Sequence, residues 1–357
     1  MLKIEDGILM SYWCFDIGNE IKLEEIEKIY GKRVEKIFLT YERLIPEYVQ
    51  YKVPPLLVRI GTKKIGNVEW NIDAKVYDFG VITLRLSTKI KGITNDITDF
   101  LNKTEQEAKK KVFVILDTII NDIKDYIDKP SAEKIFSNYT IFFVQKFDNA
   151  WKPQEIIKKF SNEIAHLLRS ESKKLSEQEI KDILKNPLSY YSDDLTIIDF
   201  NSAFIYDPRK SYDVPDVLEY AIIELTEFRT YDNFLDSVLE TTYEKLSKRR
   251  FFGLGTALNK LSQIKLEISE LKEKVENFLK LTDDSYLGKI YMAASNKFYL
   301  EKWKSSVKEK LELLDSLYSK SWERVQTVRM VWLEAAIVVL FILDIILILV
   351  ELFGGKI

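Results

Sequence analysis

Three carboxyl side chains near the end of the chain lie where ionised groups are least expected, inside an apolar run. Glu334, Asp344 and Glu351 are the charged residues between Val331 and Phe353. Intramembrane acids usually face protein or water, and proton or ion transfer is the chemistry that such groups perform. All three acids share one helical stripe, because spacings of three and four residues join Glu334, Ile337, Phe341, Asp344, Ile348 and Glu351.

This acidic stripe has three interpretations. In the first, it packs against another helix in a homo-oligomer, with Asp344 protonated or hydrogen-bonded. In the second, it belongs to a proton or ion pathway, for which a single span offers no partner base. In the third, the acids are polar residues tolerated in a plain anchor. We take the first as our hypothesis.

The run that carries the stripe predicts a transmembrane helix at residues 331–353. A helix of this length spans about 34 Å, and the hydrocarbon core of a bilayer is roughly 30 Å thick. A central Asp opposes insertion by about 3 kcal/mol, whereas each Leu, Ile, Val or Phe favours it by roughly 0.3 to 0.6 kcal/mol. Fifteen such apolar residues lie between Ile337 and Phe353. The alternative is a long apolar helix buried in a soluble core.

Basic residues flank this run unequally and predict its orientation. Lys320, Arg324 and Arg329 precede the run, and Lys356 follows it. Because positive flanks stay in the cytoplasm, we expect a single-pass protein of the cell membrane whose N-terminal bulk is cytoplasmic. Its first predicted partner is therefore the lipid bilayer.

The rest of the chain offers little for catalysis. His166 and Cys14 are the single histidine and cysteine, too few for an ordinary zinc site, and no phosphate-binding P-loop motif occurs. The pairs Asp193–Asp194 and Asp283–Asp284 are typical of turns. We therefore predict no catalytic, cofactor-binding or metal-binding residues, no cofactor and no enzymatic activity. The alternative is a carboxylate- and metal-dependent enzyme acting on a nucleotide or a membrane-adjacent substrate.

The composition of the chain narrows the remaining classes of function and of cellular compartment. Charged residues make up 31 % of the chain and nearly cancel, with a formal net charge of -3, so nothing global favours nucleic acid binding. A lone cysteine favours a reducing compartment. Acidic Glu5 and Asp6 near the N-terminus argue against a secretory signal peptide.

Residues 213–330 predict a stalk of long helices. Apolar residues repeat every three or four positions from Leu254 to Thr282 and again from Leu300 to Trp332, with turn-forming residues between. We expect an antiparallel coiled-coil hairpin whose second helix continues into the membrane, and a homo-oligomer formed through the coiled coil and the transmembrane helix.

A further helix is expected to begin near Asp213, and a cluster of bases marks its end. A helix end favours bases through its dipole, so a solvated end is one interpretation. The other is a patch for an anionic partner, either lipid headgroups or RNA. The bases are Lys245, Lys248, Arg249 and Arg250.

Residues 1–212 predict an α+β domain. Strand patterns are mixed with helical ones, which favours a largely antiparallel sheet packed against helices. Residues 71–86 alternate with period two, and we expect one strand bent near Gly80. Residues 195–207 are likewise expected to form one strand.

Four stretches resemble the family called required for meiotic nuclear division, also known as domain of unknown function 155. They are "SYWCFDIGNEIKLEEI", "VYDFGVITLRL", "IAHLLRSESKKL" and "LEAAIVVLFILDIIL". Glu334 and Asp344 occupy the places of two acids in that family's C-terminal run. The family commonly carries an Arg shortly before a Leu-Asn pair, whereas here Leu258-Asn259 follows Arg250 at a longer distance.

The resemblance implies a C-terminal anchor, and its mitochondrial members are connected with translation. It supplies no catalytic residues. We therefore predict a non-enzymatic, tail-anchored scaffold or tether, oligomeric, that holds an α+β domain at the membrane surface. The resemblance alone adds proximity to the translation machinery, and the sequence identifies no protein partner.

Overall fold

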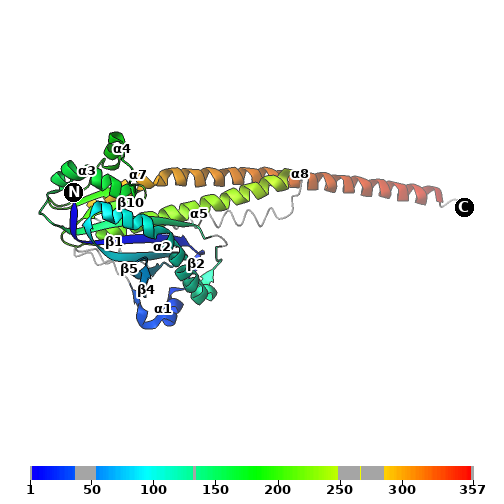
Figure 1. Ribbon diagram of the computed structural model, residues 1–357. Helices are drawn as coiled ribbons and strands as arrows, with labels where there is room; N and C mark the ends of the chain where they lie inside the picture. Colours follow the sequence, from blue (N-terminus) through cyan, green and yellow to red (C-terminus); the bar gives the residue numbers. More distant parts are fainter. Residues whose placement is uncertain (1, 37–53, 132–133, 248–265, 267–284, 355–357) are drawn as a thin grey trace. The chain divides into compact units, whose positions relative to one another are not determined.

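A computed structural model describes residues 2–36, 54–131, 134–247, 266 and 285–354 (Figure 1). The strands are β1 (Lys3–Asp16), β2 (Glu20–Ile21), β3 (Val34–Lys36), β4 (Leu56–Ile65), β5 (Val68–Val76), β6 (Val81–Ile93), β7 (Ile127–Asp128), β8 (Phe136–Phe147), β9 (Leu195–Ile198) and β10 (Ser202–Tyr206). The helices are α1 (Leu23–Tyr30), α2 (Thr94–Ile123), α3 (Pro153–Arg169), α4 (Glu177–Ile183), α5 (Asp213–Ser247), α7 (Ser285–Phe298) and α8 (Leu300–Gly354), with short 3-10 turns at Gly31–Arg33 and Lys124–Tyr126.

Eight of the described strands form one sheet with the order β3-β4-β5-β6-β1-β8-β10-β9. All neighbouring strands are antiparallel except β8 and β10, which are parallel. The first strand is also a central one, because β1 pairs with β6 on one side and β8 on the other. The predicted α+β class with a largely antiparallel sheet is confirmed.

The two faces of the sheet differ in chemistry. On one face, Trp13 and Phe15 of β1 join a continuous apolar core with Val112 and Leu116 of α2 and with residues of α3. On the other face, the first turns of α5 contact the sheet through polar side chains, which are described below. Since side chains alternate along a strand, β1, β5 and β6 serve both faces.

The prediction of one bent strand through residues 71–86 is wrong. The stretch forms two strands, β5 and β6, which pair from Asn71 opposite Ser87 to Val76 opposite Ile82. The chain reverses at Gly80, whose φ of 90° favours glycine. A turn of four residues preserves the alternation, so Val76 and Ile82 stay on the same face and the sequence pattern runs on without a visible break.

A second predicted strand is likewise a hairpin. Residues 195–207 form β9 and β10, which pair antiparallel with Ala203 opposite Ile198. The backbone N–H of Asp199 donates to the carbonyl of Ser202 at 2.8 Å and closes the turn. Asp and Asn at this turn are typical turn formers and were the overlooked signal.

The described chain divides into two compact units. The α+β unit comprises residues 1–230 and 269–304, and the helical unit comprises residues 231–268 and 305–357. Helices α5 and α8 each begin in the first unit and continue into the second. The predicted hairpin helix at Leu254–Thr282 lies, apart from Leu266, outside the described residues.

Within the helical unit, α8 pairs with α5, and the two helices are parallel. Asp232 of α5 accepts from Lys310 of α8 at 2.8 Å, and ten residues further along α5 the hydroxyls of Thr242 and Tyr318 are 2.7 Å apart. Residue numbers therefore increase in the same direction along both helices (Figure 1).

Candidate functional site

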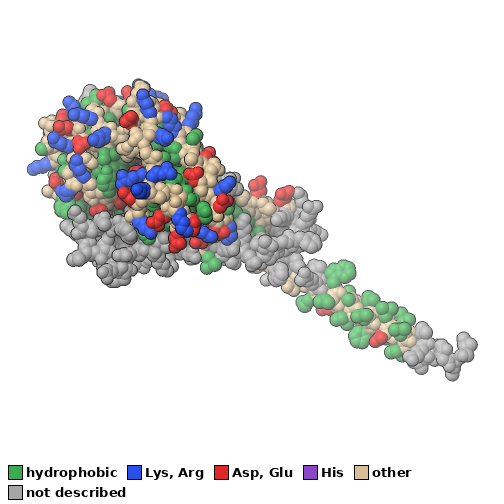
Figure 2. Space-filling view, turned by 90° about the horizontal axis from the view of Figure 1, so that it is seen from below, with side chains coloured by type: hydrophobic (Ala, Val, Ile, Leu, Met, Phe, Trp, Pro, Cys, Tyr) green, Lys and Arg blue, Asp and Glu red, His purple; other side chains and the backbone are tan. Residues whose placement is uncertain are grey.

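Helix α8 contains one segment, Met330–Leu349, that is long and apolar enough to cross a membrane. Its large side chains are exposed on all sides, with exposed fractions between 47 % at Leu349 and 73 % at Trp332. Figure 2 shows this part of α8 covered almost entirely by hydrophobic side chains. An apolar helix buried in a protein core would not be exposed in this way, so the described structure gives this segment no protein covering.

Two acids of the predicted stripe, Glu334 and Asp344, lie on this segment. Glu334 and Asp344 are exposed side chains of the uninterrupted helix α8, which continues through position 351. The predicted direct entry of the helix from Leu300 into the apolar run, without a break, is confirmed.

Only part of the basic cluster at the end of α5 falls within the described chain. Lys245 lies in the last turn of α5, which ends at Ser247. Lys248, Arg249 and Arg250 lie outside the described residues.

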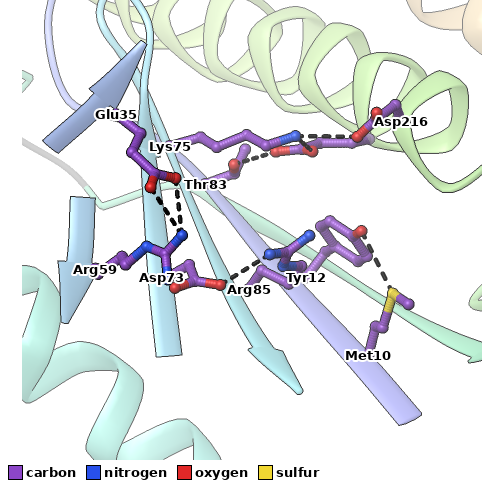
Figure 3. Close-up of polar contacts among 10 residues, drawn as sticks. Met10, Tyr12, Glu35, Arg59, Asp73, Lys75, Thr83, Arg85 and Asp216 are labelled. Atoms are coloured by element: carbon purple, nitrogen blue, oxygen red, sulfur yellow. Dashed lines mark hydrogen bonds and ion pairs between the residues drawn. The ribbon is translucent and has the colours of Figure 1, made fainter. Parts of the chain in front are cut away.

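A buried ionic network joins α5 to the sheet within the α+β unit, and the sequence analysis missed it. The carboxylate of Glu219, 1 % exposed, contacts Lys75 Nζ at 2.5 Å and accepts a hydrogen bond from Tyr77 OH at 3.1 Å. The hydroxyl of Thr83 donates to the same carboxylate. Asp216, one turn earlier on α5, contacts Lys75 at 3.1 Å (Figure 3).

The network keeps Lys75 charged despite burial. Burial alone would lower the pKa of Lys75, but Asp216 and Glu219 outweigh it, so the pKa lies above its ordinary value. Burial and the nearby Glu219 carboxylate raise the pKa of Tyr77, which keeps this hydroxyl protonated as a donor. A buried ion pair of this kind fixes the position of one helix on one sheet more than it adds stability.

A second row of charges crosses the same face of the sheet. Arg59, Asp73 and Arg85 follow one another on β4, β5 and β6, and the row ends at Tyr12 of β1 (Figure 3). Arg85 Nη2 donates to Asp73 at 2.8 Å, and Arg59 donates to both oxygens of Glu35 at 2.9 Å. Opposite charges alternate across the strands, so this row is stabilising as cross-strand pairing.

Asp16 is a buried acid at the end of β1 on this face. Its carboxylate accepts from the backbone N–H of Gly18 and from Ser131, each at 3.2 Å, and the hydroxyl of Thr230 of α5 lies nearby. Burial raises the pKa of Asp16 to about 6, although these hydrogen bonds act in the opposite direction. Asp16 therefore titrates near neutral pH at a junction of three segments.

His166 and Asp194, singled out from the sequence, make local contacts, and the pair Asp283–Asp284 lies outside the described residues. Nδ1 of His166 donates to the carbonyl of Glu171 at 2.7 Å, at the C-terminal end of α3. Asp194 accepts from the backbone N–H groups of Tyr190 and Tyr191 and pairs with Arg209, so it organises a loop. Among the described residues, no group of three or more His, Cys, Asp or Glu side chains is arranged to hold a metal ion.

One sequence signal would have revealed the network. Lys75 and Thr83 lie on the polar face of two strands whose other face is largely apolar, which is typical of a sheet exposed to water on one side. The signal is Glu219, which lies between the apolar residues Leu218 and Ala221 of α5. An acid at a buried helix position requires a basic partner, and Lys75 on the sheet is that partner.

Comparisons with known proteins place the chain in a family. It is 24 % identical to the "Uncharacterized protein MJ0711" of Methanocaldococcus jannaschii over 332 residues, which cover 91 % of this chain and 94 % of that protein. No solved structure matches. The sequence model of one family matches residues 6–213, the sheet and its covering helices. Because this match covers more than half of the chain, the chain belongs to the family described as "Uncharacterized protein MJ0711, N-terminal domain".

Proposed function

We propose that the protein is a non-enzymatic, tail-anchored membrane scaffold that holds its α+β unit at the cytoplasmic surface of the cell membrane. The observation that carries the proposal is the exposed apolar segment Met330–Leu349 at the end of α8. In water, such a surface is far larger than soluble proteins tolerate, whereas in lipid it is satisfied.

The insertion free energy supports the same conclusion. The apolar residues from Ile337 to Phe353 together favour insertion by about 5 to 9 kcal/mol, and Asp344 opposes it by about 3 kcal/mol. Glu334 lies near one interface, where a carboxylate costs less. The helix itself satisfies its backbone hydrogen bonds, which a membrane requires.

The proposal includes a homo-oligomer formed through the acidic stripe. Lipid offers the carboxyl of Asp344 no hydrogen-bond partner, and a neighbouring helix does. In the stripe, apolar residues such as Ile337 and Phe341 alternate with the acids. Two copies of the stripe can therefore pack against each other as the core positions of a coiled coil do.

The resemblance to the required-for-meiotic-nuclear-division family adds a partner to the proposal. On that resemblance alone, we propose that the scaffold works near the translation machinery. Affinity isolation of the full chain from solubilised membranes, followed by mass spectrometry, tests this part.

Alkaline carbonate extraction tests the anchor. We expect the full chain to stay in the membrane pellet, and a Leu340→Lys/Leu343→Lys variant to be released, because each central Lys costs about 3 kcal/mol. A matched control places the same charges before the span, as Gln326→Lys/Thr327→Lys, and should stay in the pellet. Release of the unmodified chain by carbonate would refute the proposal.

Cysteine crosslinking tests the oligomer. Cys14 is buried, so a new cysteine on α8 reacts selectively. Ile348→Cys lies on the acidic stripe and should form disulfide-linked dimers in membranes, whereas Ile346→Cys on the opposite side of the helix should not. Adding Asp344→Leu should reduce the dimer at position 348. Equal crosslinking at positions 348 and 346 would contradict an oligomer that packs through the acidic stripe.

A further inference from the structure

Two threonines of α5 lie opposite two side chains at the end of β1. Thr226 lies beside Cys14, and Thr230 lies beside Asp16. Residues four apart share one face of a helix, and residues two apart share one face of a strand. The helix and the strand therefore meet at two successive contacts, and the second of them includes a carboxyl group that is 6 % exposed.

Both threonine hydroxyls have already used their protons within the helix. Thr226 donates to the carbonyl of Ile222 at 2.8 Å, and Thr230 donates to the carbonyl of Thr226 at 3.0 Å. A threonine hydroxyl has one proton and two lone pairs. Each hydroxyl therefore offers only lone pairs to β1, and the group opposite it must supply the hydrogen.

Cys14 and Asp16 differ in their ability to supply that hydrogen. Burial raises the pKa of Cys14 well above its ordinary value, so the thiol keeps its proton. Asp16 has a proton to donate only when its carboxyl is not ionised. Gly18 and Ser131 both donate to Oδ1 of Asp16, which leaves Oδ2 to carry the proton toward Thr230. An ionised Asp16 instead sets lone pairs against lone pairs.

No base among the described residues pairs with Asp16, so its printed hydrogen-bond donors are neutral. Arg229 of α5 donates to the carbonyl of Phe136 and to Ser137 of β8 instead. The titratable and charged groups on the segments around Asp16 are Cys14 of β1, Tyr77 and Asp78 of the β5–β6 turn, Lys129 of the segment after β7, and Glu227 and Arg229 of α5.

We propose that Asp16 is a protonation switch between β1 and α5, which holds α5 on the sheet when protonated and releases it at Thr230 when ionised. Thr230 is the last residue of α5 in the α+β unit, and the helix then continues into the helical unit. The start of α5 stays attached in both states, because Lys75 and Glu219 hold it through an ion pair. The inference stands apart from the proposed anchor, since all of these residues belong to the α+β unit.

The reactivity of Cys14 in the full, detergent-solubilised chain tests the switch. Cys14 is the one cysteine of the chain and is buried at this contact. Its rate of reaction with a dithiodipyridine, divided by the rate of the urea-unfolded chain at the same pH, gives the fraction of open molecules. A pKa of about 6 in place of the ordinary 3.8 should make opening about tenfold more frequent at about pH 8 than at about pH 5.

The dependence of this rate on urea separates the switch from general instability. Release of α5 exposes little surface, so the opening should depend only weakly on low concentrations of urea. A steep dependence, equal to that of global unfolding, would overturn the inference, because Cys14 would then react only in unfolded molecules.

Three variants assign the effect to named groups. Asp16→Asn carries an amide N–H that can donate to Thr230 at every pH, so Cys14 should be as protected at about pH 8 as the wild type is at about pH 5. Thr230→Val removes the acceptor and should be open already at about pH 5. Asp128→Asn changes an exposed acid of β7 and should behave as the wild type.

The remaining outcomes also decide. Equal opening of the wild type at both pH values would refute the switch. A tenfold change that persists in Asp16→Asn would assign the titration to another group. A Thr230→Val variant with the full response of the wild type would show that α5 does not receive the proton of Asp16, and the inference would fail.

Discussion

At the scale of single residues, the ion pair between Lys75 and Glu219 is a buried contact that joins α5 to the sheet. Lys75→Met leaves the Glu219 carboxylate buried without its cation. We expect the free energy of unfolding to fall by about 3 kcal/mol, because an uncompensated buried charge is costly. Urea unfolding of the detergent-solubilised chain, followed by near-UV circular dichroism, measures the change.

Two further variants separate charge from packing. Lys75→Met/Glu219→Met replaces both partners with apolar side chains and should recover most of the loss, as in other buried pairs. Lys89→Met changes an exposed lysine of β6 and should shift stability by less than about 0.5 kcal/mol. An unchanged midpoint in Lys75→Met would show that the pair contributes nothing to folding.

Asp16 makes stability depend on pH. Its folded pKa, about 6, lies above the ordinary 3.8, so ionisation opposes folding. The favourable contribution is complete below about pH 4 and is lost as pH rises through about 6. Asp16→Asn removes this dependence. Relative to the variant, the wild type should lose about 3 kcal/mol of stability between about pH 4 and about pH 8.

Thermal melts of both proteins across this pH range provide the measurement. Asp128→Asn, on exposed Asp128 of β7, controls for the loss of one negative charge. If the stability difference between the wild type and Asp16→Asn were the same at every pH, the raised pKa of Asp16 would be contradicted.

At the scale of elements, the β5–β6 hairpin depends on one glycine. Gly80 has a φ of 90°, and a Cβ there would lie 1.6 Å from the carbonyl oxygen of Gly18. The backbone must therefore move, and we expect Gly80→Ala to cost more than about 3 kcal/mol or to abolish folding.

Gly288 is a glycine at which an added methyl group should stabilise the protein. It lies in α7, and a Cβ would meet nothing within 4 Å. Gly288→Ala should raise the free energy of unfolding by roughly 0.5 to 1 kcal/mol. Comparing the melting temperatures of both variants checks the pair of predictions, and equal effects of the two changes would contradict the hairpin geometry.

These elements also show what the sequence reveals and what it hides. The buried faces of Ile72, Ala74 and Val76, and of Leu84 and Leu86, follow directly from alternation. The hairpin between them stayed hidden, because its turn preserves the alternation. Likewise, the acids of the apolar segment were visible from spacing, whereas Glu219 and Lys75 are 144 residues apart and become partners only through the fold.

At the scale of the whole molecule, the orientation in the membrane is the prediction with the widest consequences. The unequal basic flanks predict that the α+β unit lies in the cytoplasm. Protease added to intact spheroplasts should leave the chain whole. Added to inside-out vesicles, it should remove the α+β unit and leave a short fragment that contains Met330–Leu349. Cleavage in spheroplasts would reverse the orientation.

The central position of β1 has a kinetic consequence. The first strand of the chain finds its neighbours far away, since Lys3 pairs with Ile93 and Ile4 with Phe147. Such non-local pairing carries a large loop-closure entropy before any contact compensates it, and proteins of this topology fold in milliseconds to seconds rather than microseconds. During synthesis, this mostly apolar strand acquires its β8 partner only after more than a hundred further residues, so β1 stays open to aggregation and to chaperones for longer than a strand that pairs with its neighbour in sequence.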